Sequence, residues 1–306
     1  MSAFKNIAVV GGTSEIGQDL IKNLLATKAE FDSIILLTRD PDSVASKALT
    51  AAGAEARKIP SELSAAAIPA LVEALKRVDV LVSIVGAQAL ADQVHLIHAS
   101  VQAGVKRFFP SEFGVDLDLQ GSTIPFLGVK VPIRQLLRSE EISSKLEHTF
   151  VENGYFMDGF FSSFFGWEIS GTSVAVNIPG TGDVPVTVTL QSDVARFLAE
   201  ILRADPAISR NKTLKFEGDR FTFNQAREIV SKAVIHVPGV KSTFSTTFTA
   251  VDTLEKRFET AEGYERAQLQ MLLATVRGQG LLSHNHNKLF PNVKPTSAKE
   301  YIATLF

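Results

Sequence analysis

The 306-residue chain contains no cysteine, so it forms no disulfide, no thiolate nucleophile and no cysteine-ligated metal site. Charge of one sign is not in excess either, because 31 basic and 33 acidic side chains leave a net charge of −2. With no long basic block, the composition argues against non-specific binding to nucleic acid. Hydrophobic residues make up 45% of the chain, which suits one large domain, or a large domain with a smaller partner.

The chain also lacks a long hydrophobic run. Its most apolar stretch, 155–167, is too short to cross a bilayer and is interrupted by Asp158 and by small residues. Only Lys5 precedes the first apolar segment as a charged residue, so no secretory signal is visible. We therefore expect a cytoplasmic protein, monomeric or homodimeric, that has neither a membrane nor a nucleic acid as partner.

Three further kinds of site lack their sequence patterns. His95 and His98 fall on a predicted helix, and His284 and His286 fall in a polar turn, without a carboxylate at ligand spacing, so we expect no metal site. Neither the G-x-S-x-G elbow nor a G-x-x-x-x-G-K loop followed by serine or threonine occurs. Serine hydrolases and P-loop nucleotide-binding proteins are thereby excluded.

The first half of the chain alternates short apolar segments with amphipathic ones. The segments rich in Val, Ile, Leu and Phe, which we predict to be strands, are 6–10, 33–38, 78–85, 107–110 and 148–151. The helical patterns between them are 16–26, 43–52, 65–77, 88–103 and 130–140. Strands that are apolar nearly throughout are typical of a parallel sheet covered on both faces. The pattern predicts an α/β fold with a doubly wound parallel sheet of the Rossmann type.

The second half predicts a smaller α+β region laid over the first. Segments 173–178 and 184–190 flank the turn-rich sequence PGTGD, and we expect them to form a strand pair. Helical patterns cover 193–204, 224–233 and about 265–277, with threonine-rich extended sequence before the last of them.

The sequence GGTSEIG, residues 11–17, directly follows the first predicted strand. Its spacing is that of the dinucleotide-binding loop G-x-x-G-x-x-G, with Ser14 in the place of the middle glycine. We expect the Ser14 hydroxyl to donate to a phosphate oxygen, and the N-terminus of the following helix to face the same anion. The residues of this loop that we predict to bind the cofactor are Gly11, Thr13, Ser14, Glu15, Ile16 and Gly17. The alternative is an ordinary turn between a strand and a helix.

The end of the second predicted strand indicates which cofactor is bound. Arg39 stands where the adenosine ribose is contacted, and an arginine suits a 2′-phosphate where an acidic residue would suit a 2′-hydroxyl. Arg39 therefore predicts NADP(H), the alternative being a solvated arginine at a strand end. The small residues after the strand at 78–85 would let the chain pass beside the nicotinamide ribose; they are Gly86 and Ala87, followed by Gln88.

A catalytic group can also be proposed. None of the three tyrosines has a lysine four residues later, so the Tyr-x-x-x-Lys pair of short-chain dehydrogenases is missing. The sequence FLGVK, residues 126–130, keeps the lysine and has Phe126 in the tyrosine position. Since phenylalanine cannot transfer a proton, that duty would pass to Lys130, whose pKa desolvation and a nearby nicotinamide would lower. The alternative is a surface lysine that opens a helix.

These residues carry a resemblance. The run VKRFFPSEFG, residues 105–114, is similar to the KRFxPSEFG signature of the isoflavone reductase-like group. That group includes phenylcoumaran benzylic ether and pinoresinol–lariciresinol reductases and belongs to the NmrA-like atypical short-chain dehydrogenases. Further matches are VDVLVS at 78–83, K-x-x-I-R at 130–134 and DVARF at 193–197, so the resemblance spans nearly the whole chain.

The resemblance implies NADPH-dependent reduction of aromatic or enone-like small molecules. By its pattern Lys130 matches the catalytic lysine, Arg39 and Arg134 match cofactor-contacting positions, and Asn153 matches an asparagine beside the nicotinamide. Lys47 matches, at looser spacing, a second lysine near the 2′-phosphate. The loop of the group reads G-x-T-G-x-x-G, and Ser14 and Glu15 depart from it. This departure concerns the affinity of the loop for the cofactor.

Aromatic side chains crowd one segment of the second half. They are Tyr155, Phe156, Phe160, Phe161, Phe164, Phe165 and Trp167, too many for one face of a helix, which indicates burial. They form either core or the wall of an apolar pocket for a flat ligand. The resemblance places the substrate here, and the pocket residues that we predict are Phe113, Tyr155, Phe156 and Phe160.

Together these features predict an NADPH-dependent reductase that transfers hydride to a polarised C=C or C=O of its substrate, with Lys130 as general acid or base. Residues 1–153 would form the NADP(H)-binding Rossmann domain and residues 154–306 the substrate-binding region, with segments that return to the first domain. The alternative is a non-catalytic NADP(H)-sensing regulator of the NmrA-like kind. Lys130 discriminates between the two, because a sensor has no need of it.

Overall fold

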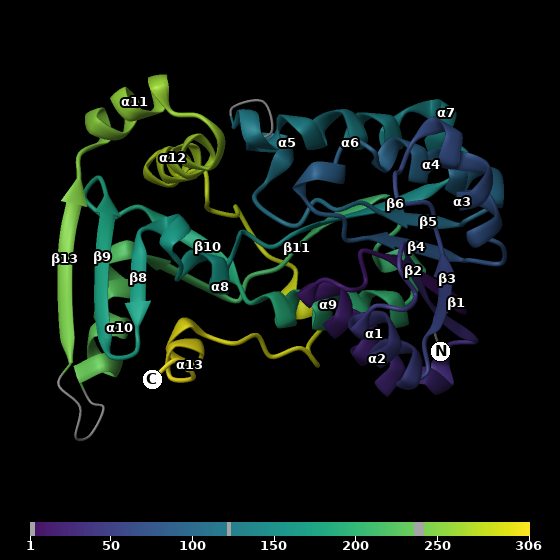
Figure 1. Cartoon of the computed structure of the whole chain (residues 1–306), viewed down its shortest axis with the longest axis horizontal. Helices are drawn as coiled ribbons and strands as arrows, with labels where there is room; N and C mark the ends of the chain where they lie inside the picture. Colours follow the sequence, from purple (N-terminus) through teal and green to yellow (C-terminus); the bar gives the residue numbers. More distant parts are fainter. Residues whose placement is uncertain (1–3, 121–123, 236–241) are drawn as a thin grey trace.

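A parallel sheet of seven strands occupies one half of the computed structural model, which describes residues 4–120, 124–235 and 242–306 (Figure 1). Its strands are β1 (Asn6–Val10), β2 (Ser33–Thr38), β3 (Glu55–Lys58), β4 (Val80–Ser83), β5 (Arg107–Phe109), β6 (Glu147–Glu152) and β11 (Lys212–Lys215). They lie in the order β11-β6-β5-β4-β1-β2-β3, and every neighbouring pair is parallel. The predicted doubly wound Rossmann-type sheet is confirmed.

Helices cover both faces of this sheet, as Figure 1 shows. One face carries α1 (Glu15–Ala26), α2 (Val44–Ala51) and α9 (Gln191–Arg203); the other carries α3 (Ile68–Ala74), α4 (Gln93–Ala103), α6 (Val131–Arg138) and α7 (Glu140–Ser143). Successive residues of β1 point to opposite faces, so Val9 joins the buried cluster that contains Leu20 and Phe197, whereas Val10 joins the cluster that contains Leu96. Burial on both sides explains why the strands are apolar throughout.

Two three-stranded sheets make up most of the second half. One contains β7 (Tyr155–Phe156), β10 (Pro185–Thr189) and β12 (Asp219–Thr222); the other contains β8 (Trp167–Ser170), β9 (Ser173–Pro179) and β13 (Thr243–Thr249). Around them lie α8 (Met157–Phe160), α10 (Phe223–Ile235), α11 (Val251–Thr260), α12 (Gly263–Val276) and α13 (Ala298–Ile302).

The expected pairing of segments 173–178 and 184–190 is wrong. Both segments are strands, but β9 pairs with β8 and β13, whereas β10 pairs with β7 and β12. The turn between them contains two glycines with positive φ, Gly180 at 60° and Gly182 at 77°. It joins two sheets that bury their apolar side chains in one shared core, instead of closing a hairpin.

Two segments of the second half belong to the large sheet. β11 pairs with β6 and forms one edge of it, and α9 packs against α1 on its face. Among the described residues, no helix is both long and apolar enough to cross a membrane.

Candidate functional site

The larger of two adjoining cavities, with a volume of about 800 Å³, lies at the carboxyl ends of β1, β2 and β4. Its walls come from the loops that follow these strands and from the segment before α3. The lining residues include Gly11, Thr13, Ser14, Thr38, Arg39, Asp40, Ser43, Ser61, Glu62, Ser64, Gly86 and Gln88. Ligands of doubly wound sheets bind at this edge, outside the carboxyl ends of the strands.

Two glycines of the loop at 11–17 are required by close packing. Gly11 has φ 77°, and a Cβ there would overlap the carbonyl of Ile84, beyond the end of β4. A Cβ on Gly17 would overlap the backbone of Gly11 and Gly12. The backbone can therefore approach a ligand closely, as a phosphate-binding turn requires.

Ser14 is the N-cap of α1. Its hydroxyl donates to the carbonyl oxygen of Gly11 at 2.7 Å and accepts from the N–H of Gly17 at 3.3 Å. The hydroxyl proton thus has an internal acceptor. Its expected donation to a phosphate oxygen stays a prediction. The cap still fixes the first turn of α1 beside the cavity, where free N–H groups favour an anion.

Some of the predicted cofactor-binding residues line the larger cavity, some line the second cavity, and others line neither. Arg39 is exposed and is the only lysine or arginine among the described residues that line the larger cavity. Lys47 does not line it, and its Nζ lies 3.1 Å from Asp42 Oδ1. Gly86 and Gln88 line the larger cavity, whereas Ile16 and Ala87 line the second; Glu15 and Gly17 line neither.

The second cavity, with a volume of about 500 Å³, is largely apolar. It shares Ser14, Ile84, Val85 and Gly86 with the first, so the two adjoin. Its other walls include Phe113, Leu127, Lys130, Tyr155, Phe156, Phe164, Phe165, Gln191 and Met271. Three of the four predicted pocket residues, Phe113, Tyr155 and Phe156, are therefore brought together.

Phe160 was expected in this wall and lies elsewhere. The aromatic segment folds as β7, α8, a short 3₁₀ turn (Ser163–Phe165) and β8, which turns successive rings in different directions. Phe160 is fully buried, with its ring 4.7 Å from that of Phe223 and 5.2 Å from that of Phe221. It is a core residue. Burial also raises the pKa of the Tyr155 phenol to about 12, which makes it a weak acid at neutral pH.

Lys130 ends a 3₁₀ turn (Pro125–Lys130) directly before α6, and it lines the second cavity while only 9% exposed. Its ammonium donates to the main-chain carbonyl of Glu112, in the loop after β5. Burial lowers the pKa of Lys130 to about 8; the positive charge of Arg134 acts in the same direction, and the carboxylate of Glu112 opposes it. The side chain of Phe126, expected in the tyrosine position, lies outside the described part of the structure.

Arg134 lies behind the cavities, 3% exposed, and lines neither of them. Its Nε is 3.1 and 3.2 Å from the two carboxylate oxygens of Glu112, and its Nη2 is 2.8 Å from Glu152 Oε1. The guanidinium is thus held by carboxylates inside the protein. The contact with a cofactor that the resemblance implies for Arg134 stays a prediction.

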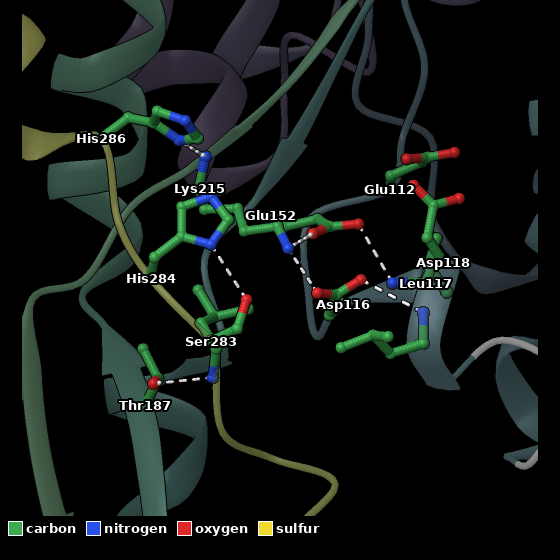
Figure 2. A network of polar contacts seen from close by, with 12 residues as sticks. Glu112, Asp116, Leu117, Asp118, Glu152, Thr187, Lys215, Ser283, His284 and His286 are labelled. Atoms are coloured by element: carbon green, nitrogen blue, oxygen red, sulfur yellow. Dashed lines mark hydrogen bonds and ion pairs between the residues drawn. The ribbon is translucent and has the colours of Figure 1, made fainter.

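A second cation completes this buried cluster, and Figure 2 shows its place. Lys215, on β11, forms an ion pair with Asp116, and its Nζ is 3.7 Å from Glu152 Oε2. The other oxygen of Glu152 accepts from the N–H of Leu117 at 3.0 Å. Burial raises the pKa of Glu152 to about 7 against the pull of Arg134. Burial likewise raises the pKa of Glu112.

Asn153 follows β6 and is fully buried without lining either cavity. Its main-chain N–H donates to Gly114 at 2.9 Å, and its side-chain amide donates to the carbonyl of Gly154 at 3.2 Å. Gly154 itself lines the second cavity. The predicted place of Asn153 beside the nicotinamide therefore stays a prediction.

Several residues at the site have no role in the sequence-based interpretation. Glu112 lies in the run at 105–114, but no role was predicted for it. The resemblance implies that its partner Arg134 contacts the cofactor. Gln191 lines the second cavity and donates from its amide to Glu15 at 3.2 Å, across 176 positions of sequence. Met271 comes from α12. Proximity in the folded chain identifies Gln191 and Met271, which no sequence pattern marks. Among the described residues, no cluster of three His, Asp or Glu side chains could hold a metal ion.

A doubly wound parallel sheet, a glycine turn that opens α1 and a cavity at the carboxyl edge together define a dinucleotide-binding protein of the Rossmann class. Comparison with known families identifies the family within this class. Residues 3–302 match the model of the NmrA-like family, and the chain belongs to that family.

Two curated relatives support the assignment. The isoflavone reductase homolog IRL of Zea mays is 32% identical over 219 residues, which cover 68% of this chain and 67% of the relative. An NmrA-like family domain-containing oxidoreductase of Gibberella moniliformis is 29% identical over 212 residues, or 69% of this chain and 66% of the relative. The alignments therefore span about two thirds of the length of these relatives. The expected relationship to the isoflavone reductase-like group of oxidoreductases is confirmed.

Solved structures share the whole fold. AtPrR2 with NADP+ and (+)pinoresinol superposes with a TM-score of 0.82 at 24% identity, over 100% of both chains. The leucoanthocyanidin reductase–NADPH complex from Vitis vinifera has a TM-score of 0.78 at 21% identity, over 98% of this chain and 99% of that one.

Proposed function

We propose that this protein is an NADPH-dependent reductase of aromatic or enone-like small molecules, which uses Lys130 to manage the proton that accompanies hydride transfer. The observation that carries the proposal is the position of Lys130. This buried lysine with a lowered pKa lines an apolar cavity that shares a wall with the glycine-loop cavity. A group poised to titrate near neutral pH suits general acid–base catalysis.

The residues present fit a dinucleotide. Gly11 and Gly17 allow the backbone to approach a pyrophosphate, the capped N-terminus of α1 would face it, and Arg39 would be available for a 2′-phosphate. Two relatives of the same fold were solved with NADP+ or NADPH. When bound, NADPH supplies the hydride.

The protein's own groups then have separate tasks. Aromatic walls such as Phe113 and Phe156 would hold a flat substrate and exclude water. As hydride adds to the electron-poor carbon of a C=C or C=O bond, the Lys130 ammonium would give one proton to the atom that gains negative charge. Lysine is left neutral and regains a proton from solvent.

Lys130→Met tests this assignment, because it keeps the length and much of the packing of the side chain. We expect a folded variant that binds NADPH and whose single-turnover rate of NADPH oxidation is about 10²–10⁴-fold lower. The substrate would be the best of a panel of quinones, enones, and phenolic ketones or ethers. A melting curve controls for misfolding.

A wild-type rate in the methionine variant would remove Lys130 from the mechanism. The remaining alternative is a non-catalytic NADP(H)-sensing regulator. It predicts that the wild type binds NADPH tightly and turns over no member of the panel.

A further inference from the structure

The loop formed by residues 111–114 connects β5 with the wall of the second cavity, and both of its ends are fixed. At one end the N–H of Ser111 donates to Gln93 Oε1 at 2.7 Å. At the other end the carbonyl of Gly114 accepts from the N–H of Asn153 at 2.9 Å. Neither contact reaches the middle of the loop.

Glu112 lies in the middle of the loop. It contacts two side chains that are one helical turn apart. Its carbonyl oxygen accepts from the Lys130 ammonium, and its carboxylate receives the guanidinium of Arg134. Arg134 follows Lys130 by four residues, one turn along the chain. Lys130 and Arg134 therefore hold the same loop residue through different groups.

Arg134 is itself fixed on its remaining sides. Its Nη2 is 2.8 Å from Glu152 Oε1, its Nη1 is 3.0 Å from Asp118 Oδ2, and its Cζ lies 4.4 Å from the centre of the Phe150 ring. Planar, forked donors of this kind orient a carboxylate more strictly than a point charge does.

We propose that Arg134 is a positioning residue of the site: by holding the carboxylate of Glu112, it fixes the carbonyl that holds the Lys130 ammonium. The inference rests on the proposed function only in that Lys130 acts on the substrate. It differs from the role that the family resemblance implies, because a positioning residue has no contact with the cofactor.

Three variants distinguish the positioning role of Arg134 from a contribution to the stability of the fold. Arg134→Lys keeps the charge but cannot grip two carboxylate oxygens and Glu152 together. Arg134→Met combined with Glu112→Gln removes a cation and an anion at once, so that less unpaired charge stays buried. The matched control is Arg138→Met, since Arg138 lies one turn further on α6, is 44% exposed at its side chain and pairs with Asp118.

Three measurements are made on each variant: the dissociation constant for NADPH, kcat and KM with the best panel substrate, and the rate at which acetic anhydride labels Lys130, followed by peptide mass spectrometry across pH. The charged groups around Lys130 are Glu112, Arg134 and Glu152. Because the lysine variant and the double variant change the net charge of this set little, the plateau rate at high pH reports the position of the amine.

We expect kcat to fall about 10²-fold in the lysine variant and in the double variant, as for a misplaced catalytic group. KM and NADPH affinity should stay at wild-type values, and the plateau labelling rate should rise because the amine is released. The Arg138 control should behave as wild type in all three measurements.

Two results would overturn the proposal. One is weaker NADPH binding with unchanged kcat, which would place Arg134 at the cofactor. The other is wild-type kcat and labelling in a folded lysine variant. If the wild type shows no turnover at all, the proposed function fails, and the labelling rates still decide whether Arg134 positions Lys130.

Discussion

We predict that the choice of cofactor depends on Arg39. It is the only described cation in the wall of the larger cavity, where Asp40, Glu62 and Asp92 are also found. We predict that NADPH binds more tightly than NADH by about 1.5–3 kcal/mol, the range of a charge-assisted hydrogen bond, and that Arg39→Ala removes the preference. Fluorescence titration with both cofactors measures this.

Lys22→Met is the matched control for Arg39, because Lys22 is an exposed cation outside the cavity that pairs with Asp19. It should keep the preference for NADPH. Equal affinities of the wild type for the two cofactors would contradict the assignment of the 2′-phosphate to Arg39.

Lys130 predicts how reduction depends on pH. Its pKa is lowered to about 8, so the ammonium that would give the proton in the proposed mechanism is present below pH 8 and is lost above it. We therefore expect kcat/KM for reduction to be level below about pH 8 and to fall about tenfold per pH unit above it. The residual rate of Lys130→Met should lack this limb. A limb that persists in the variant would assign it to another group.

The sequence predicts single residues whose type is unusual at their position in a motif. It misses residues whose role depends on partners that are distant in the sequence. Lys130 was predicted from the position of a lysine without its tyrosine, and the structure places it on the wall of the apolar cavity. Glu112 and Glu152 owe their shifted pKa values to burial around Arg134, which no local pattern reveals. Phe160 was misplaced because composition cannot tell which ring of an aromatic segment faces the core.

We predict that the glycine loop, with its helix α1, is the element that receives the cofactor. Ser14→Gly removes the capping hydroxyl but leaves the space open, so we predict a stability loss of only a few tenths of a kcal/mol and nearly intact NADPH binding. Ser14→Leu places a bulky side chain between both cavities and should largely abolish binding. Titration and melting curves measure the two effects. Normal binding by the leucine variant would mean that the phosphates lie elsewhere.

Strands and helices were predicted where an apolar pattern was present. β1, β2 and β9 were predicted almost to the residue, because each carries a run of apolar side chains. The sequences of β3, EARK, and β11, KTLK, carry no such run, since these are the two edges of the sheet. Strand pairing depends on contacts between distant segments, so the partner of β9 could not be read from the turn that follows it.

On the scale of the whole molecule, the division at residue 153 can be tested by cutting there. The fragment 1–153 keeps six strands but loses β11 from the sheet edge and α9 from the face of α1. Phe197 and Leu198 of α9 are fully buried in the same cluster as Ile7 and Leu20. We predict that the fragment shows no cooperative thermal transition by circular dichroism, whereas the full chain does. A sharp transition together with NADPH binding would establish 1–153 as an independent domain.

The late arrival of β11 also has a consequence for biosynthesis. β6 leaves the ribosome before β11 by roughly 60 residues, which at about 5–20 residues per second is an interval of several seconds. Throughout it, β6 presents unpaired N–H and C=O groups at the open edge of a nearly finished sheet, a template for pairing with another nascent chain. The translation speed of residues 153–215 therefore sets how long this edge stays exposed, and slow codons in that stretch would favour aggregation of the newly made protein.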